Sequence, residues 1–391
     1  MATTKGHCDP AFEPVRQLLS ENVQSGTDLG ASVCVNIDGK VVCDIWDGYT
    51  DKDGCVDWEK DTIINVWSCS KTVTNLAVLI AHDRGLLDVN ENISKYWPEF
   101  AENGKEDIRV KHILSHSTGI PGWENDDNIS LKDVCDPSIS TPPLAKQAPW
   151  WTPGTQSGYH AMNQGHLAGE LIRRVTGKSL KKFIAEDIAQ PLGADFQLGA
   201  VEKDWPRIST LIPPPSLVSQ TGAGEVDMNP IAMRALTNPG GSAEFALGPE
   251  WRGGEVGAAN GHGNARSLVR ILSTISLGGE VDGVKLLSPE TIDLIFQEQT
   301  NGMDLVLGKP LRFGIGYGLP LPEHVPMIPE GRICFWGGWG GSSIIMDTDK
   351  KMTISYVMNK MGAGTVGNPR TIGYIDTIYD CARKLTGETK P

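Results

Sequence analysis

Strand-like and helix-like segments are unevenly distributed along this chain of 391 residues. Runs typical of strands lie near both ends, and segments with a helical spacing of apolar residues lie between them. Two N-terminal strand candidates, residues 31–36 and 40–47, are joined by an Asp-Gly turn that favours a hairpin. The last third offers further strand candidates at residues 312–319, 333–336, 342–347 and 352–359. This order predicts an α+β fold, with a sheet flanked by helices and an inserted helical region.

The division of the chain follows from the same distribution. We expect residues 1–65 and 285–391 to form the sheet region, with surface helices near 12–22 and 372–385. Residues 66–284 are expected to form a mainly helical region with active-site loops, all within one unit. Two stretches interrupt this region: residues 136–158, predicted as an ordered loop, and residues 208–258, whose irregularity is typical of lids and binding loops.

A serine and a lysine begin one helix of the middle region. Ser68 and Lys71 lie one helical turn apart, and apolar residues recur with helical spacing as far as Arg84, where Gly85 favours a stop. A hydroxyl, an amine and the electropositive end of a helix are the parts of a Ser/Lys acyl-transfer site. This segment alone is equally compatible with a helix cap whose lysine reaches solvent. A second Ser-x-x-Lys pattern, at residues 179–182, is interpreted as a solvated helix face.

Charge and composition narrow the range of partners. The formal net charge of -13 argues against nucleic acid and against an anionic membrane surface. No apolar run is long enough to span a bilayer, and the N-terminus lacks the apolar core of a signal peptide, so we expect a cytoplasmic protein. The eight cysteines show no metal-like spacing. We therefore expect reduced thiols, no metal and no cofactor, and a small molecule as the partner.

Three motifs follow one another in the order of a known family. They are Ser68-Cys69-Ser70-Lys71, then Tyr159-His160-Ala161, then Trp336-Gly337-Gly338-Trp339. With the segments 83–88 and 112–122, they resemble the serine β-lactamase and penicillin-binding-protein superfamily in its class C branch. Within that branch the chain is most similar to the β-lactamase-like carboxylesterases of esterase family VIII. The resemblance implies a β-lactamase/transpeptidase-like fold.

The resemblance also implies roles for individual residues. Ser68 would be the nucleophile, and Lys71 and Tyr159 would share the work of general base and general acid. A nearby lysine ammonium would favour the phenolate form of Tyr159. The backbone N–H groups of Ser68 and Trp339 would form the oxyanion hole. Taken singly, the tyrosine could be a buried helix-cap aromatic and the glycines a turn; taken together, the motifs favour catalysis.

Departures from the class C pattern bear on the substrate. Those β-lactamases carry Tyr-x-Asn where this chain has Ala161, and Lys-Thr-Gly where it has Trp336, Gly337 and Gly338. An indole at Trp336 removes a cation and adds apolar surface. The resemblance therefore implies ester hydrolysis with poor turnover of β-lactams.

We expect a cytosolic serine hydrolase that cleaves small, rather apolar carboxylic esters through an acyl-Ser68 intermediate. The alternative is an acyltransferase that moves the acyl group to an alcohol in secondary metabolism. A β-lactamase, a peptidase or a catalytically silent binding protein on the same fold is disfavoured. Besides Gly337 and Gly338, the residues expected to line the substrate pocket are Trp123, Trp150, Trp151 and Trp336.

Overall fold

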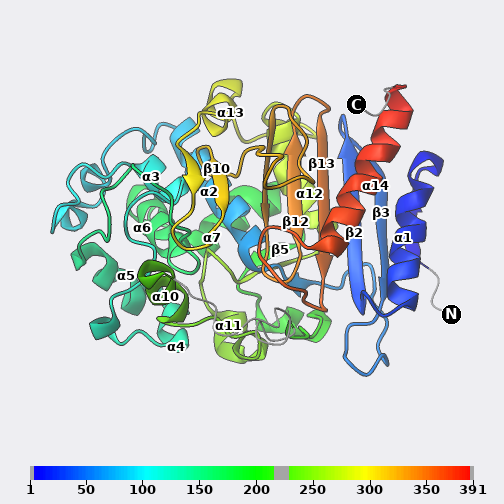
Figure 1. The fold of residues 1–391 in the computed structure, drawn as a ribbon, viewed down its shortest axis with the longest axis horizontal. Coiled ribbons are helices and arrows are strands. Elements are labelled where there is room, and N and C mark those ends of the chain that lie inside the picture. Colours follow the sequence, from blue (N-terminus) through cyan, green and yellow to red (C-terminus); the bar gives the residue numbers. More distant parts are fainter. Residues whose placement is uncertain (1–3, 215–228, 388–391) are drawn as a thin grey trace.

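A six-stranded antiparallel sheet forms one side of the molecule, and the middle of the chain forms the other (Figure 1). The computed structural model describes residues 4–214 and 229–387. The strand order is β1-β3-β2-β13-β12-β11, so N-terminal and C-terminal strands meet where β2 pairs with β13. The predicted α+β fold is confirmed. The strands are β1 (Lys5–Cys8), β2 (Gly30–Ile37), β3 (Lys40–Gly48), β11 (Ile333–Gly337), β12 (Ser343–Asp347) and β13 (Met352–Met358).

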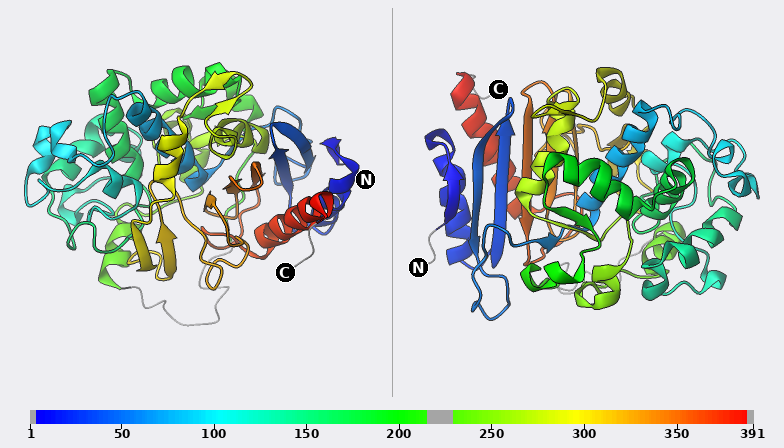
Figure 2. Two further views of the ribbon diagram at one scale, coloured as in Figure 1. Left: turned by 90° about the horizontal axis from the view of Figure 1, so that it is seen from above. Right: turned by 180° about the vertical axis from the view of Figure 1, so that it is seen from behind.

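Helices cover both faces of this sheet. Helix α12 (Ala265–Ser276) packs on β2, β12 and β13, whereas α1 (Glu13–Gln24) and α14 (Pro369–Thr386) pack together on the opposite face (Figures 1 and 2). Every residue of β13 is buried, as expected for a central strand covered on both sides. The predicted Asp-Gly hairpin joins β2 to β3, with Asp38 and Gly39 both at positive φ.

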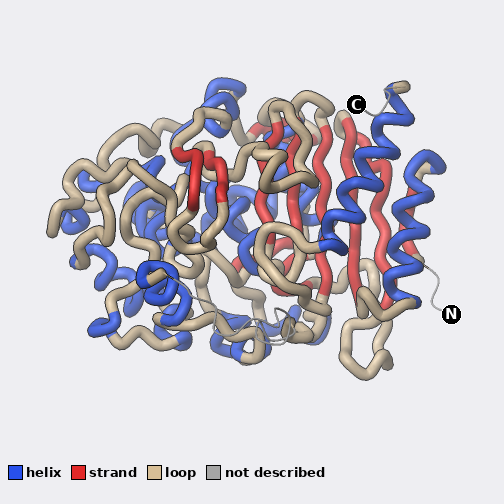
Figure 3. Tube along the Cα trace, in the orientation of Figure 1, coloured by secondary structure: helices blue, strands red, loops and turns tan. Residues whose placement is uncertain are grey.

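The helical region surrounds helix α2 (Ser70–Asp83), whose residues from Ser70 to Ala81 are all buried. A helix buried on every side belongs at the centre of its region, and α2 packs against α6 (Gln164–Thr176). Figure 3 shows how much of this side consists of short helices and loops. The other helices are α3 (Val110–Leu114), α4 (Leu131–Val134), α5 (Pro137–Lys146), α7 (Leu180–Phe183), α8 (Gln190–Leu192), α10 (Pro230–Thr237), α11 (Pro249–Gly253) and α13 (Pro289–Ile295).

Smaller strand pairings complete the molecule. A three-stranded sheet has the order β4-β6-β5, and its strand β4 leads directly to Ser68. No described helix is long and apolar enough to cross a bilayer. The short strands are β4 (Ile64–Asn65), β5 (Phe196–Leu198), β6 (Gly261–Gly263), β7 (Glu280–Val281), β8 (Val284–Lys285), β9 (Thr300–Met303) and β10 (Pro310–Phe313).

Several local predictions were wrong. The stretch 136–158 is not all loop, because α5 begins where the Asp136 side chain accepts the Ser138 N–H and Pro137 occupies the first turn. The strand predicted at 312–319 ends at Phe313. The helical spacing of apolar residues predicts a helix from Tyr159 to about Thr176, but α6 begins only at Gln164. The irregular stretch 208–258 contains α10 and α11, and its residues 215–228 lie outside the described part.

Candidate active site

Ser68 lies in a tight turn between strand β4 and helix α2, and the residue is 7% exposed. Trp67, which precedes it, has φ +48°, a left-handed conformation that is uncommon for a bulky residue. Hydrogen bonds hold this turn: the Ser70 hydroxyl donates to the Trp67 carbonyl at 2.5 Å and accepts the Gly261 N–H at 2.8 Å. Such a backbone conformation persists where the surroundings determine it, and such sites cluster at functional positions.

Lys71 is fully buried beside Ser68. Its Nζ lies 3.1 Å from Ser68 Oγ, 2.8 Å from the Ala161 carbonyl oxygen and 2.9 Å from the Ala258 carbonyl oxygen. Burial holds the pKa of Lys71 well below its usual value. A neutral amine has two N–H groups for the two carbonyls and one lone pair, which is then directed at the serine hydroxyl.

Tyr159 completes the group. Its ring centroid lies 4.7 Å from Lys71 Nζ, its hydroxyl accepts the Trp336 indole N–H at 3.1 Å, and its side chain is hydrogen-bonded to that of Ser68. Burial raises the pKa of Tyr159 above its usual value despite these two hydrogen bonds. The expected phenolate is therefore not favoured, because burial penalises the charged form more than the two hydrogen bonds stabilise it.

Two residues that the sequence analysis did not single out hold the segment around Tyr159. The backbone carbonyl of His116 accepts the Gly158 N–H at 2.9 Å. The imidazole Nδ1 of His116 accepts the backbone N–H of His160 at 3.2 Å. The His116 ring centroid lies 4.8 Å from that of Tyr159. Asp304, which is completely buried, accepts the Tyr159 N–H at 3.1 Å.

His116 has an unusual backbone. Its φ is +58°, and burial holds the pKa of its imidazole well below the usual value, so the ring is neutral and Nδ1 is free to accept a hydrogen bond. No sequence signal marks such a conformation at a histidine. His116 lies in the segment 112–122, which the sequence analysis assigned to the family framework without a catalytic role for this residue.

The glycine-rich segment after β11 runs against the serine turn. A Cβ added at Gly338 would lie 2.4 Å from the Val66 carbonyl oxygen, and one at Gly337 would lie 2.3 Å from the Thr365 carbonyl oxygen. Glycine is therefore required at both positions if the backbone is to come this close. Trp339 follows, with its ring centroid 5.0 Å from that of Trp67. The backbone N–H of Trp339 has no hydrogen-bond acceptor among the residues that the structure describes.

The tryptophans expected to line the pocket are not all near this group. Trp336 is only 3% exposed and packs its ring 5.2 Å from that of Tyr159. Trp123 is not at a pocket surface: it is buried in the helical core, where its indole donates to the Ser140 carbonyl at 2.7 Å.

Trp150 and Trp151 belong to the loop before Tyr159. The Trp150 indole N–H donates to a carboxylate oxygen of Glu124 at 2.7 Å. The guanidinium of Arg234 lies over the Trp150 ring, with its Cζ 3.9 Å from the ring centroid. The Trp151 ring lies against Gly158, where an added Cβ would come within 2.4 Å of it. These contacts account for both side chains as parts of the loop that carries Tyr159.

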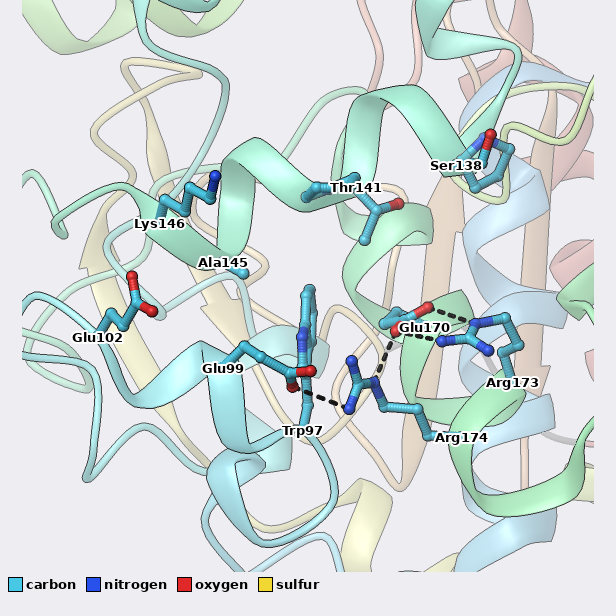
Figure 4. Close-up of a pocket in the computed structure, with 12 residues that line it drawn as sticks. Trp97, Glu99, Glu102, Ser138, Thr141, Ala145, Lys146, Glu170, Arg173 and Arg174 are labelled. Atoms are coloured by element: carbon cyan, nitrogen blue, oxygen red, sulfur yellow. Dashed lines mark hydrogen bonds and ion pairs between the residues drawn. The ribbon is translucent and has the colours of Figure 1, made fainter.

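A surface pocket of about 610 Å³ lies elsewhere, between α5, α6 and residues 97–102 (Figure 4). Four of its charged side chains, Glu99, Glu170, Arg173 and Arg174, pair with one another. Glu170 accepts from both Arg173 and Arg174, and Glu99 lies 3.0 Å from Arg174. Ser68, Lys71 and Tyr159 take no part in its lining, so it is separate from the candidate active site.

Comparisons with known proteins confirm the resemblance. The beta-lactamase family matches residues 15–375. The esterase/beta-lactamase LipL of Mycobacterium tuberculosis (strain ATCC 25618 / H37Rv) is 30% identical, over 98% of this chain and 89% of LipL. The crystal structure of a family VIII carboxylesterase is 33% identical, with a TM-score of 0.89 over 97% of this chain and 99% of that one. A penicillin-binding protein homologue from Caulobacter crescentus is 32% identical, with a TM-score of 0.87 over 97% and 99%. The chain therefore belongs to the beta-lactamase family, as a hydrolase related to the family VIII carboxylesterases.

Proposed function

We propose that this protein hydrolyses small, rather apolar carboxylic esters through an acyl intermediate on Ser68. One observation carries the proposal: the Lys71 amine lies 3.1 Å from Ser68 Oγ, and two carbonyls occupy its other hydrogen-bonding positions. A buried neutral amine so directed is a proton acceptor for the serine hydroxyl. The printed names of two relatives, an esterase/beta-lactamase and a carboxylesterase, support the same chemistry.

The first half of the proposed reaction forms the acyl-enzyme. Ser68 Oγ attacks the ester carbonyl carbon while its proton passes to Lys71 Nζ. The backbone N–H groups of Ser68 and Trp339 stabilise the negative charge that develops on the carbonyl oxygen. Tyr159, protonated at neutral pH, donates its proton to the departing alcohol oxygen. The proton held by Lys71 then passes to the Tyr159 oxygen and restores the phenol. Until it arrives, the Trp336 indole N–H stabilises the negative charge on that oxygen.

The second half releases the acid. Water attacks the acyl carbonyl and gives up its proton to the same Lys71 and Tyr159 pair, and Ser68 recovers a proton as it leaves. An alcohol can replace water in this step, because both nucleophiles meet the same acyl-serine. Transfer of the acyl group to an alcohol therefore competes with hydrolysis, and an experiment must measure both products.

The surroundings of the serine support neutral, apolar substrates. The partly exposed Trp339 packs edge to face on the buried Trp67, with ring centroids 5.0 Å apart. Trp336 contributes an indole in place of the cation that class C β-lactamases carry there. Apolar acyl groups gain from burial against such rings, whereas a substrate carboxylate finds no cation at Trp336.

The test compares wild type with Ser68→Ala on p-nitrophenyl butyrate, with nitrocefin as a β-lactam probe. We expect wild type to release p-nitrophenol with a burst and to carry a butyryl group on Ser68 by intact-protein and peptide mass spectrometry. Ser68→Ala loses both. Ser179→Ala is the matched control, because this second Ser-x-x-Lys serine only caps helix α7 by accepting the Lys182 N–H.

Three outcomes decide between the candidates. Hydrolysis that survives in Ser68→Ala contradicts the acyl-Ser68 mechanism. Faster turnover of nitrocefin than of the butyrate ester contradicts the preference for esters. A butyryl ester formed from an added alcohol at the expense of butyric acid identifies the acyltransferase.

A further inference from the structure

Two cysteines face each other at the sheet edge far from the serine. Cys8 of β1 pairs directly with Cys43 of β3, and their sulfur atoms lie 3.7 Å apart. All eight cysteines of the chain are free thiols in the structure. Among the hydrogen bonds of the described residues, no other joins two thiols. This contact is therefore distinct from the isolated cysteines of the rest of the sheet.

The strand register brings the two residues within reach of a disulfide. The Asp9 N–H donates to the Val42 carbonyl at 2.8 Å, which bonds the residue after Cys8 to the residue before Cys43. This pattern identifies Cys8 and Cys43 as a non-hydrogen-bonded antiparallel pair, whose Cα atoms are about 4.5 Å apart. Disulfides span Cα separations of about 4.4–6.8 Å, so the bond requires the side chains to rotate but not the strands to move.

The two thiols differ in accessibility and reactivity. Cys8 is partly exposed, and its pKa is lowered by the hydrogen bond with Cys43 and by the nearby Arg16. Cys43 is buried, and its pKa is raised by the same hydrogen bond and by burial. Cys8 is thus the thiol that an oxidant in solution can reach, and Cys43 is the thiol placed to react with it.

Other thiols compete poorly. Cys34 is opposite Asp44 while Cys43 is opposite Val35, so Cys34 points to the other face of the sheet. Cys55 is exposed, and its thiol donates to a backbone carbonyl. Cys381 of α14 lies close enough to Cys8 for the charge of one thiolate to affect the other. It is the competitor that an experiment must exclude.

We propose that Cys8 and Cys43 are a modification site, which a small-molecule disulfide of the glutathione class converts reversibly into an intramolecular disulfide. The Cys8 thiolate attacks one sulfur of the oxidant, so a mixed disulfide forms and one small thiol leaves. The Cys43 sulfur then attacks the Cys8 sulfur and expels the second small thiol. The two protein thiols lose two electrons and the oxidant gains them, and the two protons end on the released thiols.

The bond fastens the first strand of the sheet. Strand β1 has four residues and lies at the edge, where it covers β3. Five strand spacings separate β1 from β11 beside the serine, which is roughly 24 Å. Oxidation therefore raises the resistance of the fold to unfolding and leaves ester hydrolysis unchanged. The proposal does not depend on the ester chemistry.

The test treats reduced protein with oxidised glutathione, alkylates the remaining thiols and measures intact and peptide masses. We expect wild type to lose two hydrogen atoms, to carry no glutathione on Cys8 and to yield one linked peptide pair containing Cys8 and Cys43. Cys43→Ser instead retains a glutathione on Cys8, because no second thiol displaces it. Oxidised wild type melts a few degrees above reduced wild type, and Cys8→Ser shows no such difference.

Cys55→Ser is the matched control, since it removes an exposed thiol without touching the pair and is expected to behave as wild type. Far-UV circular dichroism of each variant shows that it is folded. The proposal is overturned if folded wild type keeps Cys8 and Cys43 open to alkylation after oxidation. It is also overturned if Cys8 links to Cys381, or if Cys43→Ser and wild type give the same products.

Discussion

At the scale of single residues, the proposed mechanism makes activation of Ser68 depend on the protonation state of Lys71. Burial holds the pKa of this amine well below its usual value. In the proposed mechanism the neutral amine is the proton acceptor, so we expect the rate to fall as the pH drops through the Lys71 pKa and to be full above it. A lowered pKa therefore extends activity toward lower pH than an ordinary lysine would permit.

Lys71→Arg tests this directly. Guanidinium stays protonated across the accessible pH range and cannot accept the serine proton. We expect kcat to fall about a hundredfold or more, with no recovery toward high pH. The measurement is the pH profile of kcat/KM on a p-nitrophenyl ester. Lys182→Arg, in the exposed second motif, is the control; equal profiles for wild type and Lys71→Arg would remove Lys71 from the role of base.

His116 provides the second prediction at this scale, as a positioning residue that acts through Tyr159. His116→Phe keeps an aromatic ring beside Tyr159 but removes the acceptor of the His160 N–H. His116→Asn keeps an acceptor oxygen and tolerates a positive φ. We expect kcat to fall about tenfold in the phenylalanine variant, with KM nearly unchanged, because an unpaired buried N–H costs about 1–3 kcal/mol.

The asparagine variant is expected to retain most of the wild-type kcat. Stopped-flow acylation and a full pH profile distinguish poor positioning of Tyr159 from general destabilisation, which would change the melting temperature without moving the profile. The idea fails if the two variants lose kcat equally.

The sequence indicated the three central side chains but not their supports. Ser68, Lys71 and Tyr159 carry their chemistry in their residue types and in their order along the chain. His116 and Asp304 act through backbone N–H groups and a left-handed φ, which depend on how distant segments meet. Burial also dominates the pKa shifts of Lys71 and Tyr159. Because the sequence does not show how deeply these side chains are buried, it led to the wrong expectation of a Tyr159 phenolate.

At the scale of elements, the sequence predicted a helix or strand correctly where its local residues all favoured one structure. It failed where those residues favoured different structures. The β2–β3 hairpin was predictable because Asp-Gly supplies the positive φ that its turn needs. Helix α5 was missed because Pro142 and Pro143 lie inside it. Strand β1 was missed because its few residues become a strand only by pairing with β3.

The approach of strand β11 to the serine gives the prediction at this scale. Gly338→Ala introduces a Cβ 2.4 Å from the Val66 carbonyl oxygen, and a backbone neighbour cannot rotate away. The segment carrying Trp339 must shift, which misplaces the second donor of the proposed oxyanion hole. We expect kcat to fall about a hundredfold while the protein stays folded.

Gly373→Ala in α14 is the control for this change. Nothing lies within 4 Å of a Cβ added there, and alanine is the better helix former. Its activity should equal that of wild type, with a slightly higher melting temperature. Wild-type kcat in Gly338→Ala would show that the close approach is not needed for catalysis.

At the scale of the whole molecule, the fold depends on joining its two ends. Asp28, just before β2, is completely buried and accepts the hydroxyls of Tyr356 at 2.6 Å and Tyr374 at 2.8 Å. Arg370 pairs with the same carboxylate at 3.2 Å. Residues of the first and last parts of the chain thus share one buried polar cluster. The predicted sheet required this meeting of the ends, although the sequence did not reveal which side chains secure it.

Removing the centre of this cluster should weaken the whole fold rather than the active site. Asp28→Ala leaves the Arg370 guanidinium buried without its carboxylate and two tyrosine hydroxyls without an acceptor. Loss of one partner of a buried ion pair costs about 3–5 kcal/mol, so we expect a corresponding fall in the free energy of unfolding in urea. Asp38→Asn is the comparison: it removes the solvent-exposed ion pair between the β2–β3 turn and Lys351 just before β13, and asparagine tolerates the positive φ of residue 38. That variant should be close to wild type. Equal losses of unfolding free energy in the two variants would mean that burial of the Asp28 cluster does not hold the ends together. A loss confined to Asp28→Ala, with kcat unchanged under conditions where the variant is still folded, assigns the cluster to the stability of the fold alone.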